Sequence, residues 1–180
     1  MNRRKNIVSA LRNVINREKN TRRNFEVFRT RNGVELVYTR NNNVGGTYLE
    51  GRRNNIDPTA FYIERGETNT KSRGKGIGKQ MRALMVLAAR NAGFKKVLQT
   101  SVFMNRNQKK THNAPPSSYI MKSLGFNRVG IHRNNNGRIN QINHVYVFKN
   151  KSNNSLLVRS AYPLRTHPLS SPPRYKRKFL

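Results

Sequence analysis

Residues 72–79 read SRGKGIGK, and this short stretch decides how the rest of the sequence is interpreted. It follows the apolar and aromatic run AFYIE (60–64) and precedes the helix-forming run QMRALMVLAARNAGF (80–94). A helix N-terminus carries unpaired N–H groups and roughly half a positive charge, and glycines let that backbone approach an anion closely. The pattern therefore predicts a phosphate-binding turn, although a tight turn without a ligand is the simpler alternative.

Two familiar phosphate-binding patterns do not fit this stretch. A Walker A loop needs four residues between its first glycine and the Gly-Lys-Ser/Thr triplet. A dinucleotide fingerprint needs G-x-G-x-x-G after an early strand of a parallel sheet. Gly74, Gly76 and Gly78 have neither spacing, and they follow what reads as an antiparallel meander.

The sequence before the turn predicts four strands, and the sequence after it predicts a helix. Asn32-Gly33 is a typical hairpin turn, and the triplet 41–43 separates the next two apolar runs. The helix carries an apolar stripe and ends at Gly93, where a left-handed C-cap belongs. The expected elements are strands 25–30, 33–39, 44–51 and 60–66, helix 77–92, strand 95–104, helix 116–124, and a hairpin around Asn134–Gly137.

The two ends of the chain differ from this middle part. Residues 6–19 form an amphipathic basic pattern, which suits a packed helix, a nucleic-acid-contacting helix or a mitochondrial presequence. Residues 150–180 combine Ser, Pro and basic residues, with too little apolar content to fold alone. We therefore expect a basic N-terminal helix or arm (1–24), a domain (25–149) and a basic tail (150–180).

The composition points to a polyanionic partner. The chain has 37 Lys and Arg against 7 Asp and Glu, a net charge of +30. Such a field attracts nucleic acid first, then anionic membrane surfaces and acidic proteins. There is no cysteine, and the four histidines show no ligand spacing, so we expect no metal site. No apolar run approaches 18 residues, so we expect no membrane span and an intracellular, by default cytoplasmic, protein, with a mitochondrion or a virus particle as alternatives.

The glycine stretch resembles the signature of the GNAT superfamily of N-acetyltransferases. Arg73, Gly76 and Gly78 match its pattern Q/R-x-x-G-x-G/A. The resemblance extends over residues 25–149, because a long helix, a strand ending in V-x-x-N (Val102 to Asn105), a helix closing on L-G-F (124–126) and a final hairpin follow in the family's order.

This resemblance implies both a fold and a cofactor. The implied fold is α/β, with a mixed, mostly antiparallel sheet that is splayed open between its fourth and fifth strands and flanked by helices. Acetyl-coenzyme A would bind in that gap, with its pyrophosphate on the turn. The implied cofactor-binding residues are Arg73, Gly74, Lys75, Gly76, Ile77, Gly78, Lys79 and Asn105.

The catalytic groups of the family are only partly present. Family members use a base, often Glu, and an acid, often a Tyr located four residues before the glycine of L-G-F. Glu64 on the fourth strand is the candidate base. Met121 occupies the acid position and a thioether cannot donate a proton, which leaves Tyr119, two residues earlier, as the candidate acid.

Two functions are consistent with these observations. The first is an acetyl-CoA-dependent N-acetyltransferase, whose amine acceptor we expect to be acidic, neutral or nucleic-acid-associated, because a basic protein repels cations. The alternative is a non-catalytic basic protein of the same fold that binds nucleic acid, for example in a ribonucleoprotein or virus particle. Met121 and the basic ends favour the alternative.

Overall fold

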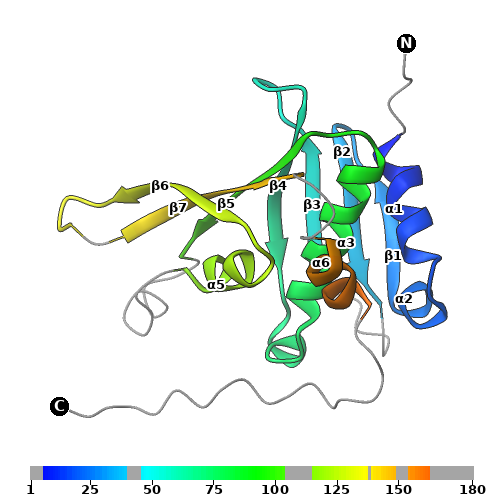
Figure 1. Cartoon of the computed structure of the whole chain (residues 1–180). Coiled ribbons are helices and arrows are strands. Elements are labelled where there is room, and N and C mark those ends of the chain that lie inside the picture. Colours follow the sequence, from blue (N-terminus) through cyan, green and yellow to red (C-terminus); the bar gives the residue numbers. More distant parts are fainter. Residues whose placement is uncertain (1–5, 40–45, 104–114, 138, 149–153, 163–180) are drawn as a thin grey trace.

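The computed structural model describes residues 6–39, 46–103, 115–137, 139–148 and 154–162 of the 180-residue chain. It is an α/β structure built on one seven-stranded sheet with the order β1-β2-β3-β4-β5-β7-β6 (Figure 1). All neighbouring strands are antiparallel except β4 and β5, which are parallel. The strands are β1 (Phe25–Arg29), β2 (Gly33–Tyr38), β3 (Tyr48–Arg53), β4 (Ala60–Glu67), β5 (Lys96–Val102), β6 (Asn127–Arg133) and β7 (Ile139–Val147).

The first four strands form the predicted meander. Alternating apolar residues place one face of each strand in the core, as in β2, where Val34 and Leu36 are fully buried. The hairpin between β1 and β2 closes with a hydrogen bond from the Thr30 amide to the Gly33 carbonyl (3.2 Å). The hairpin turn and the alternating burial of this half of the sheet therefore agree with the meander that the sequence predicted.

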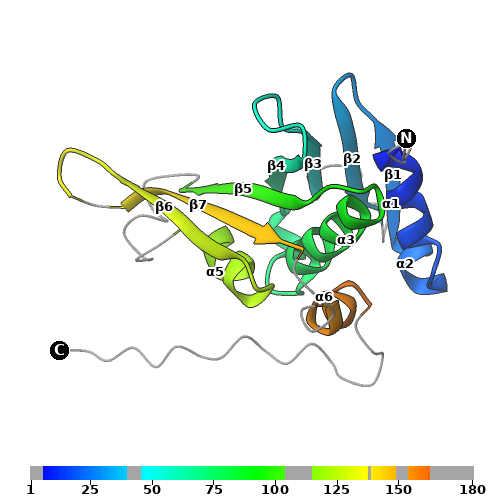
Figure 2. The same cartoon turned by 45° about the horizontal axis from the view of Figure 1, so that its top comes forward.

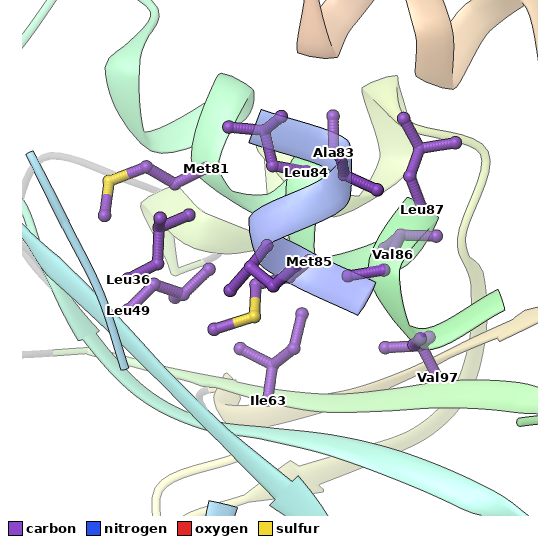
Figure 3. Packing of buried hydrophobic residues seen from close by; sticks show 14 of the residues in the cluster. Leu36, Leu49, Ile63, Met81, Ala83, Leu84, Met85, Val86, Leu87 and Val97 are labelled. Atoms are coloured by element: carbon purple, nitrogen blue, oxygen red, sulfur yellow. The ribbon is translucent and has the colours of Figure 1, made fainter. Parts of the chain in front are cut away.

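Helix α3 (Ile77–Asn91) is the central element of the core. Figure 3 shows its Met85 over Ile63 of β4, its Val86 toward Val97 of β5, and Met81 near the two leucines of β2 and β3. Eleven of its residues are buried, which explains why its sequence is apolar over most of its circumference. It ends as predicted, with Gly93 in the left-handed region at φ 88°.

The N-terminal residues form two helices, α1 (Ile7–Ile15) and α2 (Lys19–Asn24), where one longer helix was predicted. The apolar face of α1 belongs to the common core, with Leu11 and Val14 fully buried, and α1 packs against α3. The other helices of the described residues are α5 (Pro116–Ser123), α6 (Asn154–Ala161) and the 3₁₀ turn η1 (Thr70–Ser72).

The C-terminal tail begins with a helix that the sequence analysis did not predict. Helix α6 packs on α3 (Figure 2), and its Leu157 and Ala161 are buried there. The Gln80 side chain donates a hydrogen bond to the Ala161 carbonyl (2.9 Å), and the Tyr162 hydroxyl donates one to the Val14 carbonyl (2.5 Å). The segment lacks the apolar content to fold alone, and it is helical here because α3 supplies the partner surface.

The sheet splits between β4 and β5, as the resemblance implied. The two strands pair over only four residues each, from Ala60 with Lys96 to Ile63 with Gln99, and then diverge. Figure 1 shows the result: β1–β4 run nearly upright, whereas β5–β7 extend to the left. Beyond the last pair, β4 stays bonded to β3 and β5 stays bonded to β7.

A β-bulge lies at the point of divergence. Glu50 of β3 faces Arg65 of β4, but the next residue of β3, Gly51, faces Ile63, so Glu64 is an extra residue on β4. A bulge bends its strand and increases the local twist. We infer that this bulge turns β4 away from β5 directly after their last shared pair, which opens the gap.

Candidate cofactor and acyl-transfer site

The start of α3 lies beside the gap and has no cap of its own. Gly74 and Gly76 both adopt left-handed conformations, at φ 75° and 76°, which glycine adopts without strain. Gly76 is the N-cap residue and offers no side-chain oxygen, so the first-turn amides of Ile77 and Gly78 have no cap. These N–H groups, at the positive end of the helix dipole, are suited to hold an anion.

The loop that leads into α3 is held by hydrogen bonds to its own backbone and to the residue before β3. The Asn69 amide donates to Thr47 Oγ1 (2.9 Å), and the Ser72 amide donates to the Asn69 carbonyl (2.8 Å). The Arg73 Nε donates to the Thr68 carbonyl (3.1 Å), which fixes the arginine against the loop. Lys75 is exposed and Lys79 is half-buried, and both belong to the same turn as the uncapped amides.

Gly78 is buried where three elements meet. A Cβ atom added there would lie 3.1 Å from Thr68 Oγ1, 3.4 Å from Arg82 Nη1 and 3.7 Å from Ile120 Cδ1. The position therefore accepts only a very small side chain, in agreement with the Gly/Ala of the signature. Thr68 follows β4 and Ile120 belongs to α5, so Gly78 lies where α3, α5 and the end of β4 come together.

Glu64, the candidate base, is the bulged residue itself. Its Oε2 accepts a hydrogen bond from Arg52 Nε of β3 (2.8 Å), and 44% of its side chain is exposed. The guanidinium of Arg52 also lies over the Tyr62 ring, on the sheet face opposite to the buried Ile63. Glu64 therefore lies at the gap, on the face that does not carry α3.

The candidate acid is less well placed. Met121 of α5 is fully buried in the core, so the position that the family gives to its tyrosine faces inward here. Tyr119 lies on the same helix and is 46% exposed. Asn105, the remaining predicted cofactor-binding residue, lies outside the described residues.

One arginine of α3 points into the interior beside the gap. Arg82 is 6% exposed; its Nε donates to Gln99 Oε1 (3.2 Å) and its Nη1 to the Gly78 carbonyl (3.0 Å). Burial lowers the pKa of Arg82 to about 10, so the guanidinium remains charged at neutral pH. All seven acidic residues of the chain lie within the described residues, and none of them forms an ion pair with Arg82.

Two more buried polar side chains lie next to Gln99 on the helix-covered face of the sheet. Ser101 follows two residues later on β5, and His144 is the register partner of Gln99 on β7. Ser101 Oγ and both ring nitrogens of His144 are buried, and no residue that the structure describes forms a hydrogen bond with them. Burial, together with the charge of Arg128, lowers the pKa of His144 to about 4, so this ring is neutral at pH 7.

The sequence analysis identified the glycine turn but missed the buried polar residues beside it, which are Arg82, Gln99, Ser101 and His144. The sequence did contain one signal for these residues. Arg82 directly follows Met81, so a cation interrupts the apolar stripe of the helix. Gln99 and Ser101 alternate with half-exposed residues along β5, which reads as an ordinary strand pattern. Their burial depends on α3 and α5, which the sequence does not place.

Two negative findings concern the described residues. They contain no group of three His, Cys, Asp or Glu residues that could hold a metal ion. Among the helices of this part of the chain, none has the length and apolarity needed to span a membrane.

Comparison with known proteins identifies the fold. No protein-family model matches the sequence, and no curated protein sequence matches it significantly. Solved structures do match. A protein from Desulfovibrio desulfuricans assigned to the GNAT family of acetyltransferases superposes with a TM-score of 0.50 at 12% identity, covering 63% of this chain and 68% of that one.

Two further solved structures carry a coenzyme. A protein from Bacillus anthracis assigned as a streptothricin acetyltransferase, in complex with acetyl coenzyme A, matches with a TM-score of 0.50 at 15% identity, over 68% of this chain and 67% of its own. An aminoglycoside 6'-N-acetyltransferase complexed with coenzyme A matches with a TM-score of 0.50 at 13% identity, over 66% and 74%. The chain has the GNAT fold.

Proposed function

We propose that the protein is an N-acetyltransferase that binds acetyl-coenzyme A in the gap between β4 and β5. One observation carries this proposal: the sheet opens after Ile63 and Gln99 directly beside the uncapped start of α3. The amides at Gly76, Ile77 and Gly78 would hold the pyrophosphate, with Lys75 and Lys79 adding charge. The pantetheine arm would then run along the free edge of β4 toward the bulge.

The coenzyme-bound neighbours support this assignment. The Bacillus anthracis protein holds acetyl-coenzyme A and the aminoglycoside 6'-N-acetyltransferase holds coenzyme A on the same fold. Their sequence identity to this chain is too low to transfer a substrate. The coenzyme is proposed here because the chain's own turn and gap provide a pyrophosphate site and a path for the arm.

The chemistry requires two proton transfers. The neutral amine of the acceptor attacks the thioester carbonyl carbon and a C–N bond forms; as the C–S bond breaks, the nitrogen releases its extra proton and the thiolate takes one up. A base must first remove a proton from the ammonium form of the acceptor. We assign this role to Glu64, whose carboxylate lies at the gap on the face opposite to α3, so that the acceptor would approach from that face.

The role of Glu64 can be tested with an isosteric change. Glu64→Gln removes the base and should lower kcat by about 100-fold or more while leaving coenzyme affinity within about twofold, because general-base catalysis typically contributes that much. The matched control is Glu50→Gln, which removes the neighbouring ion pair with Arg65 (3.0 Å). Equal losses of activity in the two variants would show that Glu64 supports the structure of the sheet and is not the base.

Protonation of the thiolate is the weaker requirement. Tyr119 is the tyrosine of α5, and its exposure makes it available to a ligand. Tyr119→Phe should lower kcat by about tenfold if its hydroxyl supplies the proton, because general acid catalysis contributes at least that factor. An unchanged kcat would assign the proton to solvent, which a thiolate leaving group tolerates.

Turnover and binding together test the proposed function. The full-length protein should bind acetyl-coenzyme A in a calorimetric titration and transfer labelled acetyl groups to a member of a broad amine panel. Binding without transfer or hydrolysis would leave a coenzyme-binding protein that has lost its chemistry. The absence of binding to the folded protein would reject the proposal.

A second function, nucleic-acid binding, is favoured by the charge alone. Three of the seven acidic residues form ion pairs with cations among the described residues, so few acids remain to offset the 37 Lys and Arg. Binding driven by phosphate contacts should weaken steeply between about 50 and 200 mM salt, because counterions are released. Salt-insensitive binding, or none at low salt, would reject this second function.

A further inference from the structure

Within the part of the chain that the structure describes, the guanidinium of Arg82 forms no ion pair. Burying a charge without a partner costs several kcal/mol, and the usual solution is a carboxylate within hydrogen-bond distance. Here its two hydrogen-bond partners among the described residues are neutral, the Gln99 amide oxygen and the Gly78 carbonyl, and none of the seven acidic side chains forms an ion pair with it. The high positive charge of the chain makes this burial still less favourable.

Arg82 lies at the vertex of the gap. Gln99, which accepts from its Nε, belongs to the last pair that joins β5 to β4. Gly78, which accepts from its Nη1, belongs to the first turn of α3, where the proposed pyrophosphate site is located. Arg82 thus lies one helical turn further along α3 than the proposed pyrophosphate site. The acyl group of a bound coenzyme would reach this end of the gap.

Unsatisfied polar groups adjoin this position. Ser101 Oγ and the His144 ring nitrogens are buried, have no hydrogen-bond partner among the described residues and lie beside Gln99 on the same face. A hydroxyl and a neutral imidazole can both donate to an anion. Together with the planar fork of a guanidinium, they form a set of donors suited to a carboxylate, which arginine binds through two parallel hydrogen bonds.

We propose that Arg82 binds a carboxylate group carried by a substrate of the acyl transfer. The inference rests on the proposed function, because it uses the coenzyme to place the substrate. The position of Arg82, on the α3 side of the sheet, favours the acyl chain of the donor as the source of the carboxylate. The acceptor is the other source, and the experiment separates the two.

The donor arm compares acyl-coenzymes of equal carbon number that differ in a terminal carboxylate. Malonyl-CoA is compared with propionyl-CoA, and succinyl-CoA with butyryl-CoA, by calorimetric titration of the full-length protein. A carboxylate held by Arg82 should tighten binding by about tenfold or more in at least one pair. The Arg82→Met variant should remove this preference while its affinity for coenzyme A itself changes by less than about threefold.

The acceptor arm uses acetyl-CoA as the donor and compares free amino acids with the corresponding amino acid amides. If the acceptor supplies the carboxylate, Arg82→Met raises KM for the amino acids only. Arg90→Met is the matched control, since Arg90 is an exposed residue of the same helix and should change neither preference. Because the donor comparison in the unaltered protein needs no variant, the proposal remains testable even if Arg82→Met folds poorly.

Three outcomes overturn the inference or its basis. If neither carboxylated donors nor carboxylated acceptors are preferred, Arg82 has no substrate carboxylate and the inference fails while the proposed function stands. If Arg82→Met weakens all coenzyme derivatives equally, the arginine supports the fold or the coenzyme instead. If no coenzyme derivative binds the folded protein, the proposed function itself fails and the inference fails with it.

Discussion

Helices α1 and α3 pack against each other in the same core, but only α1 has a side-chain cap at its N-terminus. Helix α1 begins after Asn6, whose side chain accepts a hydrogen bond from the Val8 amide (2.9 Å). Helix α3 begins after a left-handed glycine that has no side chain to accept one. The first helix has a side-chain cap for its Val8 amide, whereas the second has none, and its first amides are available to an anion. This difference separates a structural helix from one that is suited to bind a ligand.

The largest effect should come from giving α3 a charge at its start. In Gly76→Asp, a carboxylate would lie within about 4 Å of the bound pyrophosphate and repel it by about 1–4 kcal/mol. We expect coenzyme affinity, measured by calorimetry, to fall by about 5- to 1,000-fold. Gly76→Asn is the matched control, because asparagine is uncharged, similar in size and tolerant of left-handed φ angles. It should lose much less affinity, and equal losses in the two variants would contradict an electrostatic role for this position.

The next effect concerns the space around Gly78. Gly78→Leu would force a side chain between Thr68, Arg82 and Ile120 and should cost about 1–3 kcal/mol of unfolding free energy, as overpacking usually does. Coenzyme binding should also be lost, because the first turn would move. Gly78→Ala adds only the Cβ and gains helix propensity, so its stability should change by less than about 1 kcal/mol. Chemical denaturation followed by circular dichroism measures both, and similar values would show that the site is not tightly packed.

The smallest effect should come from removing the cap of α1. Asn6→Ala leaves the Val8 amide without its acceptor and should lower the unfolding free energy by about 1 kcal/mol. Coenzyme affinity should be unchanged, since α1 takes no part in the site. A loss of coenzyme binding comparable to that of Gly76→Asp would remove the distinction between the two helix starts.

The parts of the molecule that the sequence predicted well are those with local signals. The alternation in β2, the glycines at 76 and 93, and the apolar face of α3 each determine a local structure without help from distant residues. The order of these elements was then enough to predict the splayed sheet through the GNAT resemblance. The pairing of Ile63 with Gln99 agrees with that prediction.

The parts that were missed depend on contacts between distant segments. The bulge at Glu64 is one extra residue on a strand, and no residue type specifies it. Helix α6 is only eight residues long, and α3 provides the surface that buries Leu157. The burial of Arg82 follows from the packing of α3 against β5. Such features become visible only when the elements are placed in space.

Backbone amide shifts measured by ¹H–¹⁵N NMR on the labelled protein test the central claim most directly. On titration with acetyl-coenzyme A, the amide signals of Gly76, Ile77 and Gly78 should shift strongly and saturate together, whereas the signal of Val8 at the capped start of α1 should stay in place. Saturating binding that leaves the amides of residues 76–78 unchanged would contradict the account, because the coenzyme would then bind elsewhere.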